Sequence, residues 1–129
     1  MNRPSSLGLR HLALKVRDMK LMRSFYVDVL GFSVEWEPDP QNLYLTSGSD
    51  NLALHEVTEK ISAGSLDHLG IVVKTPHDVD SWASYLESKD VSLLTKPKTH
   101  RDGARSIYLK DPEENVIQII FHPPISNKL

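Results

Sequence analysis

Two histidines, His11 and His68, occupy equivalent positions in two copies of a similar segment. Each is followed two positions later by a very small residue, Ala13 or Gly70, which leaves room beside the imidazole for an ion or a ligand. Neutral imidazoles are good ligands for zinc, nickel, iron and manganese. The repeat therefore predicts a site for a divalent metal ion that His11 and His68 share.

A third ligand is expected from the last predicted strand, residues 115–121. Its bulky apolar residues alternate with Gln118, so Gln118 faces the side away from the core, as His11 does in the strand predicted at 9–16. A catalytic metal needs about three protein ligands and an open position. We predict that His11, His68 and Gln118 supply them, although a neutral amide oxygen attracts a cation less than a carboxylate would.

The same alternation nominates residues that bind substrate. Ser106 and Tyr108 alternate with apolar residues, and their hydroxyls can donate hydrogen bonds to substrate oxygens. Loop lysine and arginine side chains, at positions 98 and 101, can add charge if they fold over the site. The predicted substrate-binding residues are Tyr44, His55, Arg105, Ser106 and Tyr108. Alternatively, Tyr108 only fills the wall of the cavity and the basic loop is a solvated surface.

The remaining histidines and one carboxylate are expected to lie elsewhere. His77 and His100 are interpreted as surface or loop residues, and His122 lies beyond the last strand. His55 itself would face outward if the strand register shifted by one residue. Glu56 is the nearest candidate for a general base, but the alternation points it away from the cavity.

The elements that must position these residues occur in the same order twice. The first unit, about 7–58, is predicted as a strand at 9–16, a helix from Asp18 to Gly31, and strands at 32–36, 42–47 and 51–57. The second, about 65–122, is predicted as a strand at 66–74, a helix capped by Thr75, and strands at 91–95, 105–110 and 115–121. In the second helix Val79, Trp82 and Leu86 form the expected buried stripe, and residues 96–103 form a long connection.

This order predicts an α+β fold in one domain, residues 1–129. Two tandem βαβββ units should form a curved mixed sheet around a cavity, with each helix on the opposite face of its sheet. The cavity closes either within one chain or across a homodimer.

Composition excludes several classes of protein and site. The chain has 129 residues, 40% hydrophobic and 25% charged, with a net charge of -2, which gives no sign of nucleic-acid or membrane-surface binding. It contains no cysteine, so disulfides, cysteine-ligated zinc and thiol nucleophiles are excluded. No signal peptide and no run approaching about 20 apolar residues is visible. A cytoplasmic protein is expected.

Three stretches resemble the vicinal oxygen chelate superfamily, whose members include glyoxalase I, fosfomycin-modifying thiol transferases, methylmalonyl-CoA epimerase, extradiol dioxygenases and bleomycin-resistance proteins. They are residues 10–16 (RHLALKV), 25–32 (FYVDVLGF) and 108–119 (YLKDPEENVIQI). The resemblance covers almost the whole chain, and its FYxxxLGF and DPxxNxIxI patterns are specific for the fold rather than for one reaction.

The resemblance implies a metal-dependent enzyme of lyase, thiol transferase or dioxygenase type. His11 and His68 match two of the family's ligand positions, and Gln118 matches a third, where the family usually has glutamate. Ala53 stands at the fourth and supplies no ligand. In such enzymes the metal stabilises an oxyanion that develops on the substrate. The alternative is a metal-free protein that binds a drug-like molecule and confers antibiotic resistance, as bleomycin-resistance proteins do.

Overall fold

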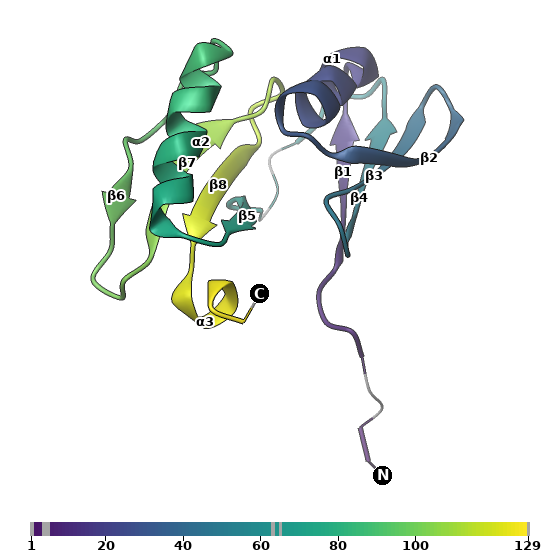
Figure 1. The fold of residues 1–129 in the computed structure, drawn as a ribbon. Helices are drawn as coiled ribbons and strands as arrows, with labels where there is room; N and C mark the ends of the chain where they lie inside the picture. Colours follow the sequence, from purple (N-terminus) through teal and green to yellow (C-terminus); the bar gives the residue numbers. More distant parts are fainter. Residues whose placement is uncertain (1, 4–5, 63, 65, 129) are drawn as a thin grey trace. The chain divides into compact units, whose positions relative to one another are not determined.

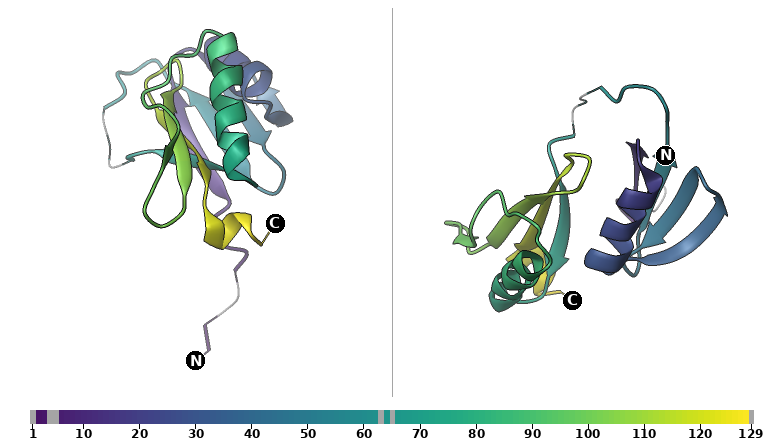
Figure 2. Two further views of the ribbon diagram at one scale, coloured as in Figure 1. Left: turned by 60° about the vertical axis from the view of Figure 1, so that its left-hand side comes forward. Right: turned by 90° about the horizontal axis from the view of Figure 1, so that it is seen from above.

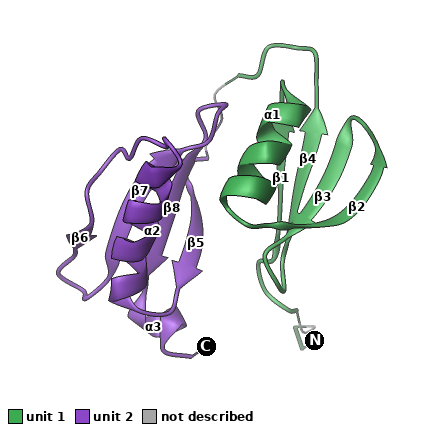
Figure 3. Cartoon of the chain, turned by 45° about the horizontal axis from the view of Figure 1, so that its top comes forward, with its two compact units in different colours: residues 1–62 green, residues 63–129 purple. Residues whose placement is uncertain are grey.

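The computed structural model describes residues 2–3, 6–62, 64 and 66–128. The chain divides into two compact units, residues 1–62 and 63–129, which are coloured separately in Figure 3. Each unit contains one four-stranded mixed sheet with helical segments, so the predicted α+β class is confirmed. The prediction that the two units act as a single domain stays a prediction.

Unit 1 follows the predicted order of one strand, one helix and three strands. Its elements are β1 (His11–Val16), α1 (Met19–Arg23), which continues as the π-helical segment η1 (Ser24–Val29), β2 (Ser33–Asp39), β3 (Asn42–Thr46) and β4 (Asn51–Glu56). The sheet order is β1-β4-β3-β2. β1 pairs with β4 in parallel, whereas β3 pairs antiparallel with both of its neighbours.

The helical segment of unit 1 begins and ends where the sequence predicts. The Asp18 side chain accepts a hydrogen bond from Leu21 N at 3.0 Å, and Gly31 adopts a φ of 84°, which favours glycine. The π turn, with Leu30 N donating to Phe25 O at 3.0 Å, was not predicted. Because it inserts an extra residue into the helical period, Tyr26 is fully buried beside Phe25.

The helix covers one face of the unit 1 sheet (Figure 1). That face carries the apolar core, formed by Leu14, Val16, Leu43, Leu45, Leu52 and Leu54. Glu56 also points to the helix side, where its carboxylate accepts a hydrogen bond from Met19 N at 2.8 Å. We call the other side of this sheet the open face of unit 1; it carries His11, Ala13, Tyr44, Asn51, Ala53 and His55.

Unit 2 repeats this order of elements, except that the strand after its helix is very short. Its elements are β5 (Leu69–Val73), α2 (Pro76–Ser88), β6 (Lys98–Thr99), β7 (Arg105–Lys110), β8 (Val116–Phe121) and α3 (Pro123–Ser126). The sheet order is β5-β8-β7-β6, with β5 and β8 parallel. α2 lies along one face of this sheet in both views of Figure 2. The other side, the open face of unit 2, carries Gly70, Ser106, Tyr108, Gln118 and Ile120.

The strand predicted at 91–95 does not form. Only Leu93 makes an isolated bridge, to Leu109, and the hydroxyl of Thr95 accepts the hydrogen bond that Tyr108 N donates, at 3.0 Å. A side chain thus replaces the backbone carbonyl that a longer ladder would need. The pairing with β7 is made instead by β6, inside the segment 96–103 that was predicted to be a connection.

The second helix has the predicted start but a different buried stripe. Thr75 and Asp78 form a capping box. Val79, Ala83 and Leu86 are buried, as their helical spacing allows. The prediction that Trp82 belongs to this stripe is wrong, because Trp82 lies at the side of α2 and packs edge-on against Tyr85, with ring centroids 5.4 Å apart. In the described part of the chain, no helix is long and apolar enough to cross a bilayer.

Candidate metal and ligand site

His11 stands at the start of β1, on the open face of unit 1. Its Nδ1 lies 2.8 Å from Asn51 Oδ1. The Asn51 amide nitrogen donates to Glu35 Oε1 at 3.1 Å, which turns the amide oxygen toward the imidazole. An amide oxygen can only accept, so in its neutral form His11 carries its proton on Nδ1 and Nε2 presents a lone pair.

His68 is held in the same way by a different partner. Its Nδ1 lies 2.6 Å from Asp67 Oδ2. An ionised carboxylate only accepts hydrogen bonds, so Nδ1 of His68 is the donor and Nε2 is the nitrogen left for another partner. Histidines that bind metals almost always donate the other ring N–H to a carboxylate, a carbonyl or a water. In their neutral form, both predicted histidine ligands therefore have the tautomer that a metal site requires.

Gln118 lies on the same open face of unit 2 as His68. It is paired across the sheet with Gly70 on β5 and Tyr108 on β7. The Tyr108 ring meets the His68 ring edge-on, with centroids 5.4 Å apart, so these three side chains lie on one face. Gln118 is only 9% exposed, and its amide has no hydrogen-bond partner among the residues that the structure describes.

The three predicted metal ligands are thus divided between the units, with His11 in unit 1 and the other two in unit 2. Among the described residues there is no cluster of three or more His, Asp or Glu side chains that could bind a metal without an amide ligand. Ala53 lies on the open face of unit 1 and is fully buried. The shared metal site of His11, His68 and Gln118 stays a prediction.

Tyr44 and His55 lie on the open face of unit 1, where the alternation predicts them. Their rings meet edge-on, with centroids 5.8 Å apart, and His55 Nδ1 lies 2.6 Å from Asn42 Oδ1. Trp36 on β2 stacks on Tyr44 at 5.2 Å and is 58% exposed. Trp36 was not among the predicted residues, because the bulges of β2 break the alternation and only the aromatic side chain itself was a signal.

Ser106 lies on the open face of unit 2, but its hydroxyl is already engaged. Ser106 is 2% exposed, and its Oγ lies 2.9 Å from His100 Nε2. His100 is a loop residue, as the sequence predicts, but the hairpin after β6 also brings it onto Ser106, a contact that was not predicted. No periodic pattern could have indicated this contact, which depends on the shape of a turn.

Arg105 points to the helix side of unit 2, away from Ser106 and Tyr108. Its Nε and Nη2 donate to the two carboxylate oxygens of Asp80 on α2, at 3.1 and 2.7 Å, and its Nη1 donates to Thr99 Oγ1 at 2.8 Å. Neighbouring residues on a strand point to opposite faces of the sheet, so the side chains of Arg105 and Ser106 cannot both lie on the open face. The expectation that Arg105 contacts substrate beside Ser106 is corrected: Arg105 joins α2 to β7.

The two charges also change each other's affinity for protons. The hydrogen bonds from Arg105 hold the pKa of the Asp80 carboxyl below its usual value, and the same contact raises the pKa of the Arg105 guanidinium. A carboxyl whose pKa is lower in the folded state stabilises the fold above its unfolded pKa. That contribution is lost as the pH falls through the lower, folded pKa.

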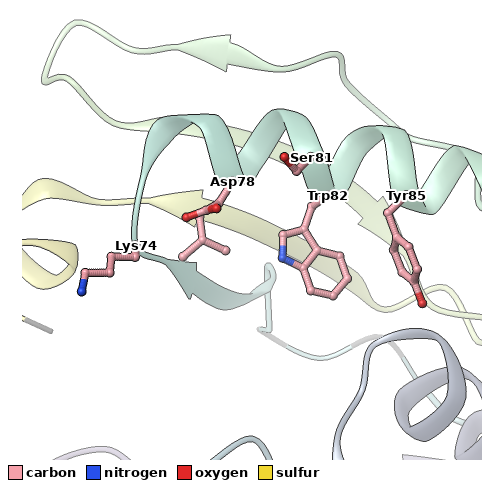
Figure 4. Close-up of a pocket in the computed structure, with 6 residues that line it drawn as sticks. Lys74, Asp78, Ser81, Trp82 and Tyr85 are labelled. Atoms are coloured by element: carbon pink, nitrogen blue, oxygen red, sulfur yellow. The ribbon is translucent and has the colours of Figure 1, made fainter.

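A shallow hollow lies beside α2, with a volume of about 510 Å³. Figure 4 shows Lys74, Asp78, Ser81, Trp82 and Tyr85 along it. It lies by the helix of unit 2, and none of the residues predicted to bind metal or substrate lines it. The candidate site is therefore defined by the open faces of the sheets rather than by this hollow.

Comparisons with known proteins show which family this chain belongs to and which folds it resembles. The family model described as Glyoxalase/Bleomycin resistance protein/Dioxygenase superfamily matches residues 8–119. Virulence protein STM3117 of Salmonella typhimurium (strain LT2) is 31% identical over 119 residues, 84% of this chain and 80% of that protein. Its crystal structure covers 92% of this chain and 99% of its own, with a TM-score of 0.72 and 25% identity. Lactoylglutathione lyase from Agrobacterium tumefaciens has a similar fold, with a TM-score of 0.78 and 18% identity over 95% of this chain and 98% of that one.

Asp80→Asn should lower the free energy of unfolding slightly at neutral pH, because exposed ion pairs contribute little to stability. The difference from the wild type should disappear in acid, where Asp80 of the wild type is also protonated. Urea denaturation at several pH values measures this. Glu87→Gln, on the same helix, is the matched control and should show no such pH dependence. Equal stability of Asp80→Asn and wild type at every pH would contradict the role given to this pair.

Proposed function

The chain belongs to the Glyoxalase/Bleomycin resistance protein/Dioxygenase superfamily, and we propose that it is a divalent-metal-dependent enzyme that acts on a small molecule. His11, His68 and Gln118 are the proposed ligands. The reaction is of the lyase, thiol transferase or dioxygenase type that the superfamily includes. The observation that carries the proposal is the hydrogen bonding of the two histidines, which leaves Nε2 of each as the free nitrogen.

The donors present fit zinc, nickel, manganese or iron. Two imidazole nitrogens and one amide oxygen give three protein ligands, which leaves positions for substrate or water. Gln118 supports this because its amide lies on the same face as His68 and has no hydrogen-bond partner among the described residues. When bound, the metal would supply a positive charge that stabilises an oxyanion on the substrate.

The chain's own residues would orient the substrate. Tyr108 can donate a hydrogen bond to a substrate oxygen from a position against His68. Tyr44 and His55 would line the other open face, with His55 held by Asn42. Glu56 cannot act as a general base there, because its carboxylate accepts the hydrogen bond of Met19 N on the helix side.

Because the proposed ligands come from both units, the site needs the two open faces to meet. They can meet within one chain or across a homodimer, and we propose a homodimer. A mixture of His11→Ala and His68→Ala chains distinguishes the two arrangements. If the faces meet across the dimer, the mixed dimer regains one intact site; if they meet within one chain, the mixture has none.

The second candidate is a metal-free protein that binds a small molecule. It is favoured by one observation, the exposed Trp36 stacked on Tyr44, which gives an aromatic surface for a planar ligand. Metal analysis distinguishes the two functions, because a binding protein of this kind needs no metal to hold its ligand.

Protein purified without a chelator should contain about one divalent ion per chain. His11→Ala and His68→Ala should each remove it, because either change leaves only two donors. Elemental analysis measures the content, and His77→Ala, an exposed histidine of α2, is the matched control that should retain the ion. If the wild type binds none of zinc, nickel, manganese or iron after each is added, the metal-free candidate is favoured instead.

Gln118→Glu should tighten binding of the divalent ion by about tenfold or more, because a carboxylate adds a charge to the ligand set. Isothermal titration of the metal-free proteins with zinc compares the two affinities. Gln41→Glu, an exposed glutamine of unit 1, controls for the change in net charge. An affinity that is unchanged or weaker in Gln118→Glu would remove Gln118 from the ligand set.

A further inference from the structure

We propose that His100 is the centre of a subsite for an anionic oxygen group of the ligand, such as a carboxylate, sulfonate or phosphonate. The inference rests on the proposed function in one respect, since it takes the open face of unit 2 as a ligand-binding face. In this subsite Ser106 is the anchor of the imidazole rather than the group that meets the ligand.

The backbone of His100 is fixed by a tight hairpin between β6 and β7. His100 N donates to Ala104 O at 2.7 Å, and Gly103 N donates to His100 O at 3.0 Å. Gly103 has a φ of 87°, which a residue with a side chain rarely adopts. Asp102 also accepts the hydrogen bond of Ala104 N, at 3.0 Å. The imidazole therefore projects from a well-defined turn.

The buried hydroxyl of Ser106 fixes the orientation of the His100 ring. The hydroxyl is almost completely buried and lies 2.9 Å from Nε2, whereas His100 remains partly exposed. Among the residues that the structure describes, none hydrogen-bonds Nδ1 of His100. The imidazole, with Nδ1 as its free nitrogen, is therefore the group that this part of the open face presents.

The charges around His100 favour an anion. Lys98 is the cross-strand partner of Ser106 and so lies on the same face; it is exposed and forms no ion pair with a described residue. In the turn, Arg101 is exposed and the carboxylate of Asp102 accepts a backbone hydrogen bond. On β8 the partner of Ser106 is the uncharged Ile120.

The helix that lies near the hairpin adds no charge. α3, whose Pro123 lies near Gly103, contains no charged residue. Arg105 and Asp80 neutralise each other on the helix side. Titratable groups at this end of the sheet also include His122, just after β8, and Lys74, just after β5.

Protonation of His100 completes the subsite. The imidazolium has two N–H donors, so Nε2–H can donate to the hydroxyl of Ser106 while Nδ1–H donates to a ligand oxygen. The second hydrogen bond is charge-assisted and therefore stronger than its neutral counterpart. Histidine side chains change charge between about pH 5 and pH 8. An anionic ligand should thus bind more tightly at the acidic end of this range.

The test uses metal-free protein and methanesulfonate, whose single negative charge does not change over this range. Its binding is followed by NMR at the backbone amides of residues 100–104, with neutral dimethyl sulfone as the matched probe. The affinity for methanesulfonate should be about threefold or more higher at about pH 5.5 than at about pH 8. Dimethyl sulfone should shift these amides weakly and equally at both pH values.

Variants separate the effect of the His100 charge from that of the Ser106 hydroxyl that holds the ring. His100→Asn should abolish the pH dependence, and Ser106→Ala should weaken binding at both pH values while keeping the dependence. His77→Asn is the matched control and should behave as the wild type. Lys98→Met, an exposed position, should lower the affinity at both pH values, and it gives a second test if His100→Asn fails to fold.

The inference is overturned if methanesulfonate leaves the hairpin amides unshifted at about pH 5.5, or if folded His100→Asn keeps the full pH dependence. Zinc titration of the same proteins keeps this result distinct from the proposed function. Zinc binding without anion binding would overturn only the subsite, whereas anion binding without zinc binding would overturn only the metal-dependent function.

Discussion

The parallel pairing of the first and last strands within each unit determines which side chains can meet. In unit 1 the register sets His11 opposite Asn51, and in unit 2 it sets Gly70 opposite Gln118. A shift of one residue would turn every side chain of a strand to the other face. Burial of the leucine-rich face under α1 and of Ile117 and Ile119 in unit 2 opposes such a shift, because it would expose the core. The candidate ligands are therefore positioned by the core on the other side of their own strands.

His11 and His68 are oriented by different hydrogen-bond partners, and each partner leaves Nε2 of the ring free. His11 is held by an amide whose own orientation depends on Glu35. His68 is held directly by the adjacent Asp67, whose carboxylate is largely exposed. The carboxylate and the amide oxygen both accept the hydrogen bond of Nδ1–H, and each fixes the orientation of its imidazole. His55 repeats the amide arrangement through Asn42, but it lies two alternations along β4 from Asn51, beside Tyr44 rather than His11.

Alternation and capping predicted most of the fold that positions the site. They placed β1, β7 and β8, the Asp18 and Thr75 caps, and the face of Glu56. They failed where a side chain replaced a backbone partner, as Thr95 does for Tyr108 N. They also placed Trp82 wrongly in the buried stripe of α2. Helical spacing allows either Trp82 or Ala83 to face the core between Val79 and Leu86, and Ala83 is the residue that does.

The errors within the candidate site have a different cause. Arg105 was selected for its charge near Ser106, although alternation itself assigns the two residues to opposite faces. His100 was passed over because its place depends on a hairpin whose turn no periodicity encodes. Sequence patterns specify the side of a strand well, but contacts made by turns and by short strands such as β6 need the three-dimensional arrangement.

The proposed function depends on His11 and His68 binding one metal ion through Nε2. Long-range ¹⁵N–¹H NMR of the imidazole rings, with and without zinc, observes this binding at the nitrogens themselves, and His77, an exposed histidine of α2, serves as an internal reference. In the neutral rings of the metal-free protein, His11 and His68 should be protonated at Nδ1. Nε2 of both should shift together as zinc binds, while His77 does not change. Zinc that shifts only one of the two rings, or a proton on Nε2 of either in the neutral metal-free protein, would show that the two histidines do not share a metal ion in this way.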